Sequence, residues 1–259
     1  MSIQITAELV KQLRDATGVS VMQCKKALEE AEGNMDKAVA ILKKNSSAVA
    51  LKKADRLAND GGVTVKSTDN KAVLVTLHCE TDFVAKNADF TNLLSTLADK
   101  ALTEGLDKMA SEAKDMIDPI IQKTGENIVL GESYEVVGDV LGNYVHNGKM
   151  AVVVSLIGGT TELAKDIAMH IAAMKPEFMN ANEITIEERK TVEEISKKEV
   201  EASDKPEEIK KKILEGKVNT YFKERTLTDQ NFIKNPDETI GSLLSKAKAT
   251  IKEVKRYSI

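Results

Sequence analysis

Aromatic residues are scarce in this sequence. Its 259 residues include no tryptophan, five phenylalanines and four tyrosines, so aromatic side chains make up 3% of the chain. Hydrophobic residues still reach 42% and charged residues 30%, which favours helix-rich cores built from aliphatic side chains. The length suffices for two or three compact units. With so few aromatic residues, one that sits at a corner of the chain rather than in a core is noteworthy.

Cysteine is scarce as well. Cys24 and Cys79 lie far apart without Cys-x-x-Cys spacing, which argues against a zinc site or a disulfide framework. No window approaches the roughly 18 apolar residues of a membrane span. The amino terminus has neither an apolar signal core nor an arginine-rich transit pattern. We therefore expect a soluble, cytoplasmic protein without a membrane partner.

An excess of basic residues is also lacking. Lysine and arginine number 37 against 41 acidic residues, a net charge of −4. Dedicated nucleic-acid binders usually carry a strong basic excess, so we expect no direct nucleic-acid partner. The lysines alternate with acidic residues along predicted helices, which is typical of solvated faces.

No catalytic or cofactor-binding pattern emerges. The stretch 142–150 resembles a phosphate-binding loop only superficially, because it has one residue too many between its glycines and Met150 where serine or threonine is required. His78, His146 and His170 lack metal-ligand spacing. We interpret His78 and His170 as structural. His146 lies beside a predicted turn, and a contact with a partner and the absence of any role are equally compatible with that position. We expect no enzyme, no cofactor and no metal.

Residues 6–44 predict three short helices. Ser20 and Gln23 form a capping box before the second helix, and Asn34 can cap the third. The inward-facing positions are Leu9, Val10 and Leu13, then Cys24, Ala27, Leu28 and Ala31, then Met35, Ala38, Val39 and Leu42. Such a unit is near the lower size limit for a domain. Residues 45–60 read as a polar, partly helical linker.

Strands follow. Residues 63–65 and 72–77 flank a predicted hairpin turn, and apolar residues recur at helical spacing over 87–102. Asp118-Pro119 is predicted to open a further helix near its first turn. Asn147-Gly148 then predicts a second hairpin, between 144–146 and 150–157.

The carboxyl-terminal third is more charged. Thr185 and Glu188 form a capping box for a long helix that is predicted to end near 203–206. The apolar stripe from there to residue 222 is narrow, which favours a projecting antiparallel helical hairpin at about 186–226. A helix around 240–247 and a strand around 251–257 close the chain.

An internal repeat relates two of these segments. Residues 72–86 match 151–165 at an offset of 79. The identical pairs are Ala72/Ala151, Val73/Val152, Val75/Val154, Leu77/Leu156, Thr81/Thr160, Ala85/Ala164 and Lys86/Lys165. Each copy reads as a strand followed by the start of a helix. At the corner between them, Asp82-Phe83 in the first copy becomes Thr161-Glu162 in the second.

Two interpretations of this corner stay open. Phe83 either packs under its own helix or anchors a protein partner, since aromatic residues on rigid corners are typical hot spots. A glutamate at the matching position of the second copy favours the anchor. Asp82 likewise either caps the helix or has a role toward a partner.

Several motifs resemble translation elongation factor Ts. They are Leu13-Arg14-Asp15-Ala16-Thr17-Gly18, Met22-Gln23-Cys24-Lys25-Lys26-Ala27-Leu28, Thr81-Asp82-Phe83-Val84-Ala85-Lys86, Gly125-Glu126-Asn127-Ile128, Tyr144-Val145-His146 and Ala168-Met169-His170-Ile171-Ala172-Ala173. The resemblance implies an α+β protein with a ubiquitin-associated-like helical domain (1–54), a duplicated α/β core with small antiparallel sheets (55–139 and 140–259) and the helical hairpin. Family members often continue past the last strand with a Phe-Glu-Val-Gly-Glu-like tail. This sequence stops at Ile259, so contacts of that tail are not carried over.

The resemblance also implies a function. The family exchanges nucleotide on the GTPase elongation factor Tu, which it binds in GDP-bound and nucleotide-free states. Asp82-Phe83, framed by Thr81 and Val84, would be the wedge that enters the GTPase near its magnesium ion. Other implied contacts with the GTPase involve Arg14, Met22 and His146. An adaptor of the ubiquitin-associated type without exchange activity is the alternative, and the oligomeric state, a homodimer included, stays open.

Overall fold

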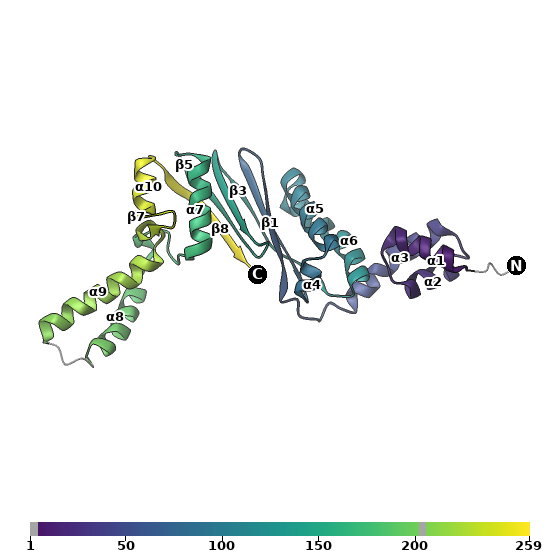
Figure 1. Cartoon of the computed structure of the whole chain (residues 1–259), viewed down its shortest axis with the longest axis horizontal. Coiled ribbons are helices and arrows are strands. Elements are labelled where there is room, and N and C mark those ends of the chain that lie inside the picture. Colours follow the sequence, from purple (N-terminus) through teal and green to yellow (C-terminus); the bar gives the residue numbers. More distant parts are fainter. Residues whose placement is uncertain (1–4, 202–205) are drawn as a thin grey trace. The chain divides into compact units, whose positions relative to one another are not determined.

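The computed structural model describes residues 5–201 and 206–259. It is mixed helix and strand with small sheets, which confirms the α+β prediction (Figure 1). The chain forms two compact units. The first runs to Glu135 and includes Val145–Ala151 and Tyr257–Ile259, and the second comprises Val136–Tyr144 and Val152–Arg256. The three-domain division predicted from the sequence stays a prediction.

The first unit begins with three helices. They are α1 (Ala7–Thr17), α2 (Val21–Glu30) and α3 (Met35–Leu51), capped by Thr6, Ser20 and Asn34. The predicted inward-facing residues are buried, or partly buried in the case of Leu9 and Met35, except that Val39 is exposed and was wrongly assigned. Ser20 accepts a hydrogen bond from the Gln23 N–H, as a capping box requires. The reciprocal bond is absent, because the Gln23 side-chain oxygen has no partner among the described residues.

Helix α3 is longer than predicted and enters the core that follows. It continues to Leu51, and Ala50 packs with the apolar residues of the first sheet and its helices. The predicted linker is therefore helical up to Leu51. A truncation near residue 50 would remove part of this core as well as the three-helix segment.

The first sheet has the order β1-β2-β3. Its strands are β1 (Asp60–Ser67), β2 (Lys71–Cys79) and β3 (Ile128–Val137), and its helices are α4 (Asp82–Ala85), α5 (Ala88–Glu104) and α6 (Leu106–Thr124). The antiparallel register places Asp60 opposite Cys79 and Ser67 opposite Ala72, which confirms the predicted hairpin. Alternate residues of β2 pack with α5 and α6, which lie along one face of the sheet (Figure 1).

The expected helix start at Pro119 is wrong. Pro119 lies inside α6, which begins at Leu106. A proline inside a helix loses one backbone hydrogen bond and disfavours the preceding turn. A stripe of apolar residues that recur every four positions is buried in the hydrophobic core between the first sheet and its helices, here called the first core: Met109, Ala113, Ile117 and Ile121. Burial of this continuous stripe holds the helix together across the proline.

The second unit carries the second copy of the repeat. Its elements, of which β4, β5 and β8 extend into the first unit at one end, are β4 (Val140–His146), β5 (Met150–Ile157), α7 (Thr161–Met174), α8 (Ile186–Glu201), α9 (Glu207–Arg225), β6 (Asn231–Phe232), β7 (Asn235–Thr239), α10 (Ile240–Lys246) and β8 (Thr250–Ser258), with short 3-10 turns at Ala181–Glu183 and Leu227–Asp229. One sheet has the order β4-β5-β8, and β6 pairs with β7. Asn147 and Gly148 both have positive φ, as the predicted two-residue turn requires.

Helices α8 and α9 form the predicted antiparallel hairpin. The Lys210 ammonium donates to the Glu201 carbonyl, and Lys217 pairs with Glu199 at 2.5 Å. Farther along, the Arg189 guanidinium lies 5.3 Å from the centroid of the Phe222 ring. Residues later in α9 thus pair with residues earlier in α8, as antiparallel helices require. The Thr185–Glu188 capping box is present, while residues 203–205 of the helix end predicted near 203–206 lie outside the described residues.

Candidate partner-binding site

The corner after β2 is built by Thr81. Its backbone is extended (φ −132°, ψ 157°), and its hydroxyl oxygen accepts the Val84 N–H as the amino-terminal cap of α4. Thr160 caps α7 in the same way (φ −132°, ψ 159°) and accepts the Leu163 N–H. The repeat read from the sequence is therefore also a repeat of backbone conformation and capping. Because Thr81 is the cap, the reading of Asp82 as the cap is wrong.

Phe83 points into solvent. Its side chain is 83% exposed, more than any other large apolar side chain among the described residues. Phe90, Phe222 and Phe232 are buried, so aromatic side chains elsewhere in the chain do enter cores. The alternative in which Phe83 packs under its own helix is excluded. Its neighbour Val84 faces the first core instead.

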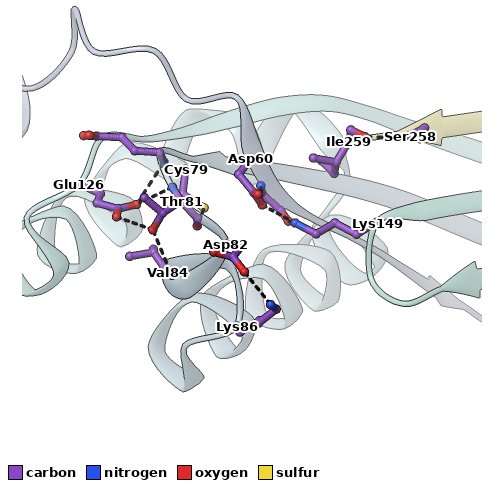
Figure 2. Close-up of polar contacts among 12 residues, drawn as sticks. Asp60, Cys79, Thr81, Asp82, Val84, Lys86, Glu126, Lys149, Ser258 and Ile259 are labelled. Carbon is purple, nitrogen blue, oxygen red and sulfur yellow. Dashed lines mark hydrogen bonds and ion pairs between the residues drawn. The ribbon is translucent and has the colours of Figure 1, made fainter.

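Asp82 and Lys86 pair on the surface of α4. The Lys86 ammonium donates to the Asp82 carboxylate at 2.7 Å (Figure 2). This hydrogen bond raises the pKa of Lys86. Both groups are solvent-accessible, so the pair adds little to stability and leaves the carboxylate within reach of a partner.

Glu126 holds the corner from the far end of α6. Its carboxylate accepts the Thr81 hydroxyl at 2.6 Å, the Thr81 N–H at 3.0 Å and the Glu80 N–H at 3.1 Å (Figure 2). Gly125 makes this approach feasible. It adopts a left-handed conformation (φ 76°) that ends α6 and donates its N–H to the Ile121 carbonyl.

Glu80 returns the interaction. Its carboxylate accepts the Asn127 N–H at 2.6 Å and the Arg56 guanidinium at 3.4 Å. The Asn127 amide in turn donates to the Arg56 carbonyl at 2.8 Å. Each of two acidic side chains thus binds the backbone beside the other. Hydrogen bonds to charged groups are stronger than neutral ones, so the corner is tied to the start of β3 by a rigid set of contacts.

Cys79, the last residue of β2, has no nucleophilic role here. It is fully buried, and its thiol donates to the Thr81 carbonyl at 3.2 Å. Burial raises its pKa to about 12, with further contributions from the negative charges of Asp60 and Glu126. The thiol is therefore protonated at neutral pH and serves as a small apolar core residue with a weak hydrogen bond.

The turn that carries His146 is fastened at the same end of β1. The Lys149 ammonium contacts the Asp60 carboxylate and donates to the Gly61 carbonyl at 2.7 Å (Figure 2). The hydrogen bond from Lys149 lowers the pKa of Asp60. The backbone adds a bond from the Val63 N–H to the Gly148 carbonyl at 2.8 Å. Because Asp60 is opposite Cys79, this anchor and the corner share one end of the β1–β2 hairpin.

The remaining predicted contact residues are exposed. Arg14 lies on α1, and Met22, 76% exposed, lies on the first turn of α2 beside the exposed Val21. His146 is exposed on the turn after β4. The structure brings Thr81, Asp82, Phe83 and Val84 together at one corner, while Arg14 and Met22 belong to the three-helix segment.

Glu80 and Glu126 were not identified as site residues from the sequence. The motif Gly125-Glu126-Asn127-Ile128 indicated the family resemblance but no role for Glu126. A pattern that could have indicated the role of Glu126 is a glycine at a helix end followed at once by an acidic residue. What that residue binds depends on a contact 45 residues away in sequence.

Within residues 5–201 and 206–259, no three histidine, cysteine or acidic side chains are grouped so that they could hold a metal ion. No helix among the described segments is long and apolar enough to cross a membrane.

Comparison with known proteins gives a consistent result. A family model described as elongation factor TS matches residues 80–259. A relative named elongation factor Ts from Hahella chejuensis is 41% identical over 262 residues, covering 98% of this chain and 92% of the relative. Relatives of the same name from Marinobacter nauticus and Aeromonas salmonicida are 40% and 39% identical, covering 94% and 98% of this chain and 86% and 90% of their own.

Proposed function

The chain belongs to the elongation factor Ts family, and from this premise we propose that it is the guanine nucleotide exchange factor of the GTPase elongation factor Tu. In this proposal it binds the GDP-bound GTPase, promotes GDP release and holds the nucleotide-free state during translation elongation. It acts through protein–protein contacts and makes or breaks no covalent bond.

The exposure of Phe83 carries the proposal. An aromatic side chain in water on a corner fixed by Thr81 and Glu126 loses little conformational freedom when a partner buries it. Anchors of this kind contribute roughly 2–4 kcal/mol to binding. The second copy has Glu162 at the matching position, so the fold itself has no need of an aromatic residue there.

Linkage sets what the anchor must achieve. A factor that binds the nucleotide-free GTPase more tightly than the GDP-bound form weakens GDP binding by the same ratio. A 10⁴-fold ratio requires about 5.5 kcal/mol of differential contact, more than one aromatic anchor supplies. Disturbing the magnesium ion of the GTPase is the second source, because that ion is a large local charge in the phosphate site. Asp82, accessible beside Phe83, is placed to contribute this effect.

The other exposed residues have a different part in the proposal. Arg14 and Met22 on the three-helix segment contribute affinity by binding the GTPase alongside the wedge. His146 contributes a further contact from the turn fixed by the Asp60–Lys149 pair.

The test is a time course of GDP release from elongation factor Tu loaded with a fluorescent GDP. We expect the wild-type chain to accelerate release and Phe83→Ala to lose most of the acceleration. Ile157→Ala, which truncates another exposed apolar side chain outside the corner, is the control and should behave as wild type. Binding without acceleration, unaffected by Phe83→Ala, would favour the adaptor. No binding at all would exclude both functions.

A further inference from the structure

In both copies of the repeat an acidic residue influences the capping threonine or is influenced by it, but it stands at a different place in the sequence. In the second copy the pKa of Glu162 is lowered by its own backbone N–H and by the Thr160 side chain. Phe83 stands at that position in the first copy and has no polar side-chain atom to accept a hydrogen bond. There the Thr81 hydroxyl donates to Glu126, 45 residues farther along the chain.

We propose that Glu126 is a positioning residue for the exposed anchor Phe83: its carboxylate holds the Thr81 hydroxyl and the backbone N–H groups of residues 80 and 81, and so fixes the corner on which Phe83 stands. This inference rests on the proposed function. It assigns to Glu126 no contact with the partner. Glu126 acts through the backbone of residues 80 and 81, where its carboxylate receives two N–H bonds in addition to the hydroxyl bond.

The shortness of α4 explains why such support is needed. The helix has four residues, and Asn87 caps the next helix immediately afterwards. A single turn is unstable by itself, because nucleation fixes several residues for few hydrogen bonds. In the second copy α7 continues for 14 residues, so its first turn is held by the rest of the helix. The corner that carries Phe83 therefore depends on contacts from outside the helix.

Without Glu126, three donors at the corner would lose their acceptor. The Thr81 N–H, the Thr81 hydroxyl and the Glu80 N–H would have to find water or rearrange. The reciprocal bond from the Asn127 N–H to Glu80 would still tie the two segments together. We therefore expect that removing Glu126 makes the side chain of residue 83 more mobile, while the corner stays attached to the start of β3. A loosened anchor binds more weakly because its ordering must then occur on binding.

The absence of tryptophan from the sequence supplies a direct probe. In Phe83→Trp the indole is the single tryptophan of the chain, and its fluorescence anisotropy reports how freely residue 83 moves. Adding Glu126→Ala should lower the steady-state anisotropy of Trp clearly, and Glu126→Gln, which retains one acceptor oxygen, should lower it less. Glu162→Ala, the matched change in the second copy, should leave it unchanged.

Exchange assays with Phe83 intact provide the second readout. We expect Glu126→Ala to slow saturating GDP release by roughly tenfold, equivalent to about 1.4 kcal/mol. Glu126→Gln should recover part of this loss, and Glu162→Ala should stay close to wild type. If Glu126→Ala does not fold, the Glu126→Gln variant decides, with a smaller shift expected in both assays.

A double variant distinguishes the stability of the first turn of α4 from the contact that the Phe83 side chain makes with a partner. In the Glu126→Ala background, Phe83→Glu places at residue 83 the glutamate that the second copy has at residue 162. It should restore protection of the Val84 and Ala85 amides from hydrogen exchange while GDP release stays slow. Unchanged anisotropy in the Glu126 variants, or unchanged exchange despite lowered anisotropy, overturns the proposal. If the wild-type chain does not accelerate GDP release, the proposed function fails, and the anisotropy and amide protection still decide whether Glu126 positions residue 83.

Discussion

Thr81 and Thr160, 79 residues apart, cap their helices with the same extended backbone and the same hydroxyl-to-backbone hydrogen bond. The corner is thus a structural device that the chain uses twice. In one copy the residue two positions after the cap is an exposed phenylalanine, and in the other it is Glu162. Because the same corner forms with either residue, the fold does not require an aromatic side chain at residue 83, and this side chain is available for a partner.

Phe83→Ala should therefore leave the fold intact. Substitutions at exposed positions usually change the free energy of unfolding by less than about 0.5 kcal/mol. We expect a melting temperature close to wild type and catalysed GDP release slowed at least roughly tenfold, as for the loss of a contact of about 1.4 kcal/mol. Thermal unfolding and stopped-flow release measure the two quantities. Exchange lost in proportion to unfolded protein would return Phe83 to a packing role.

Asp82 should act through the magnesium ion of the GTPase. A carboxylate near a bound magnesium ion can compete for coordination or for the groups that orient its waters. We expect the acceleration over spontaneous release to shrink when magnesium is chelated, because the contribution of the ion is then already gone. The residual acceleration should be similar for wild type and Asp82→Asn. An acceleration of equal ratio with and without magnesium would instead indicate that Phe83 distorts the phosphate site directly.

The three-helix segment should govern affinity more than the maximal rate. Deleting residues 1–50 would test this poorly, because Ala50 belongs to the first core. The double substitution Arg14→Ala with Met22→Ala removes two exposed side chains and leaves that core untouched. We expect the half-saturating concentration for exchange to rise roughly tenfold, as for a combined loss of about 1.4 kcal/mol. The saturating rate should change little, and its complete loss would contradict this division of labour.

His170 should make stability depend on pH. It is fully buried, its Nε2 lies 2.9 Å from the Gln230 side-chain oxygen, and burial lowers its pKa below the ordinary value of 6.5. In the unfolded chain the imidazole takes up a proton at about pH 6.5. As pH falls below that value, the unfolded state binds more protons than the folded state, so the free energy of unfolding decreases.

This contribution is fully present above about pH 6.5 and declines down to the lowered pKa of the folded state, with a slope of at most about 1.4 kcal/mol per pH unit. Urea unfolding at pH 7.5, 6.5 and 5.5 measures it. His170→Gln should be less stable at pH 7.5 and show a smaller decrease toward pH 5.5. The exposed His146 provides the control, and His146→Gln should retain the wild-type decrease. Equal decreases in wild type and His170→Gln would contradict the assignment.

Much of the local structure follows from the sequence because it depends on residues a few positions apart. The caps at Thr6, Ser20 and Asn34 need only a short polar side chain before an apolar period. The Asn147-Gly148 turn needs two residues that accept positive φ. The repeat is visible because strand and helix onset recur together, and the resemblance to the family rests on short motifs spread along the whole chain.

Other features were decided only when distant segments packed. Pro119 was expected to open a helix, but burial of a stripe on both sides of it extends α6 across the proline. Whether Phe83 enters a core or faces water could not be read from its neighbours, since both outcomes suit a residue on a strand-to-helix corner. The direction of Phe83 is fixed by Glu126, which reaches Thr81 because α6 ends at Gly125. Local sequence patterns report short-range preferences, whereas an exposed anchor depends on long-range contacts that hold its backbone, and only the tertiary structure brings those contacts together.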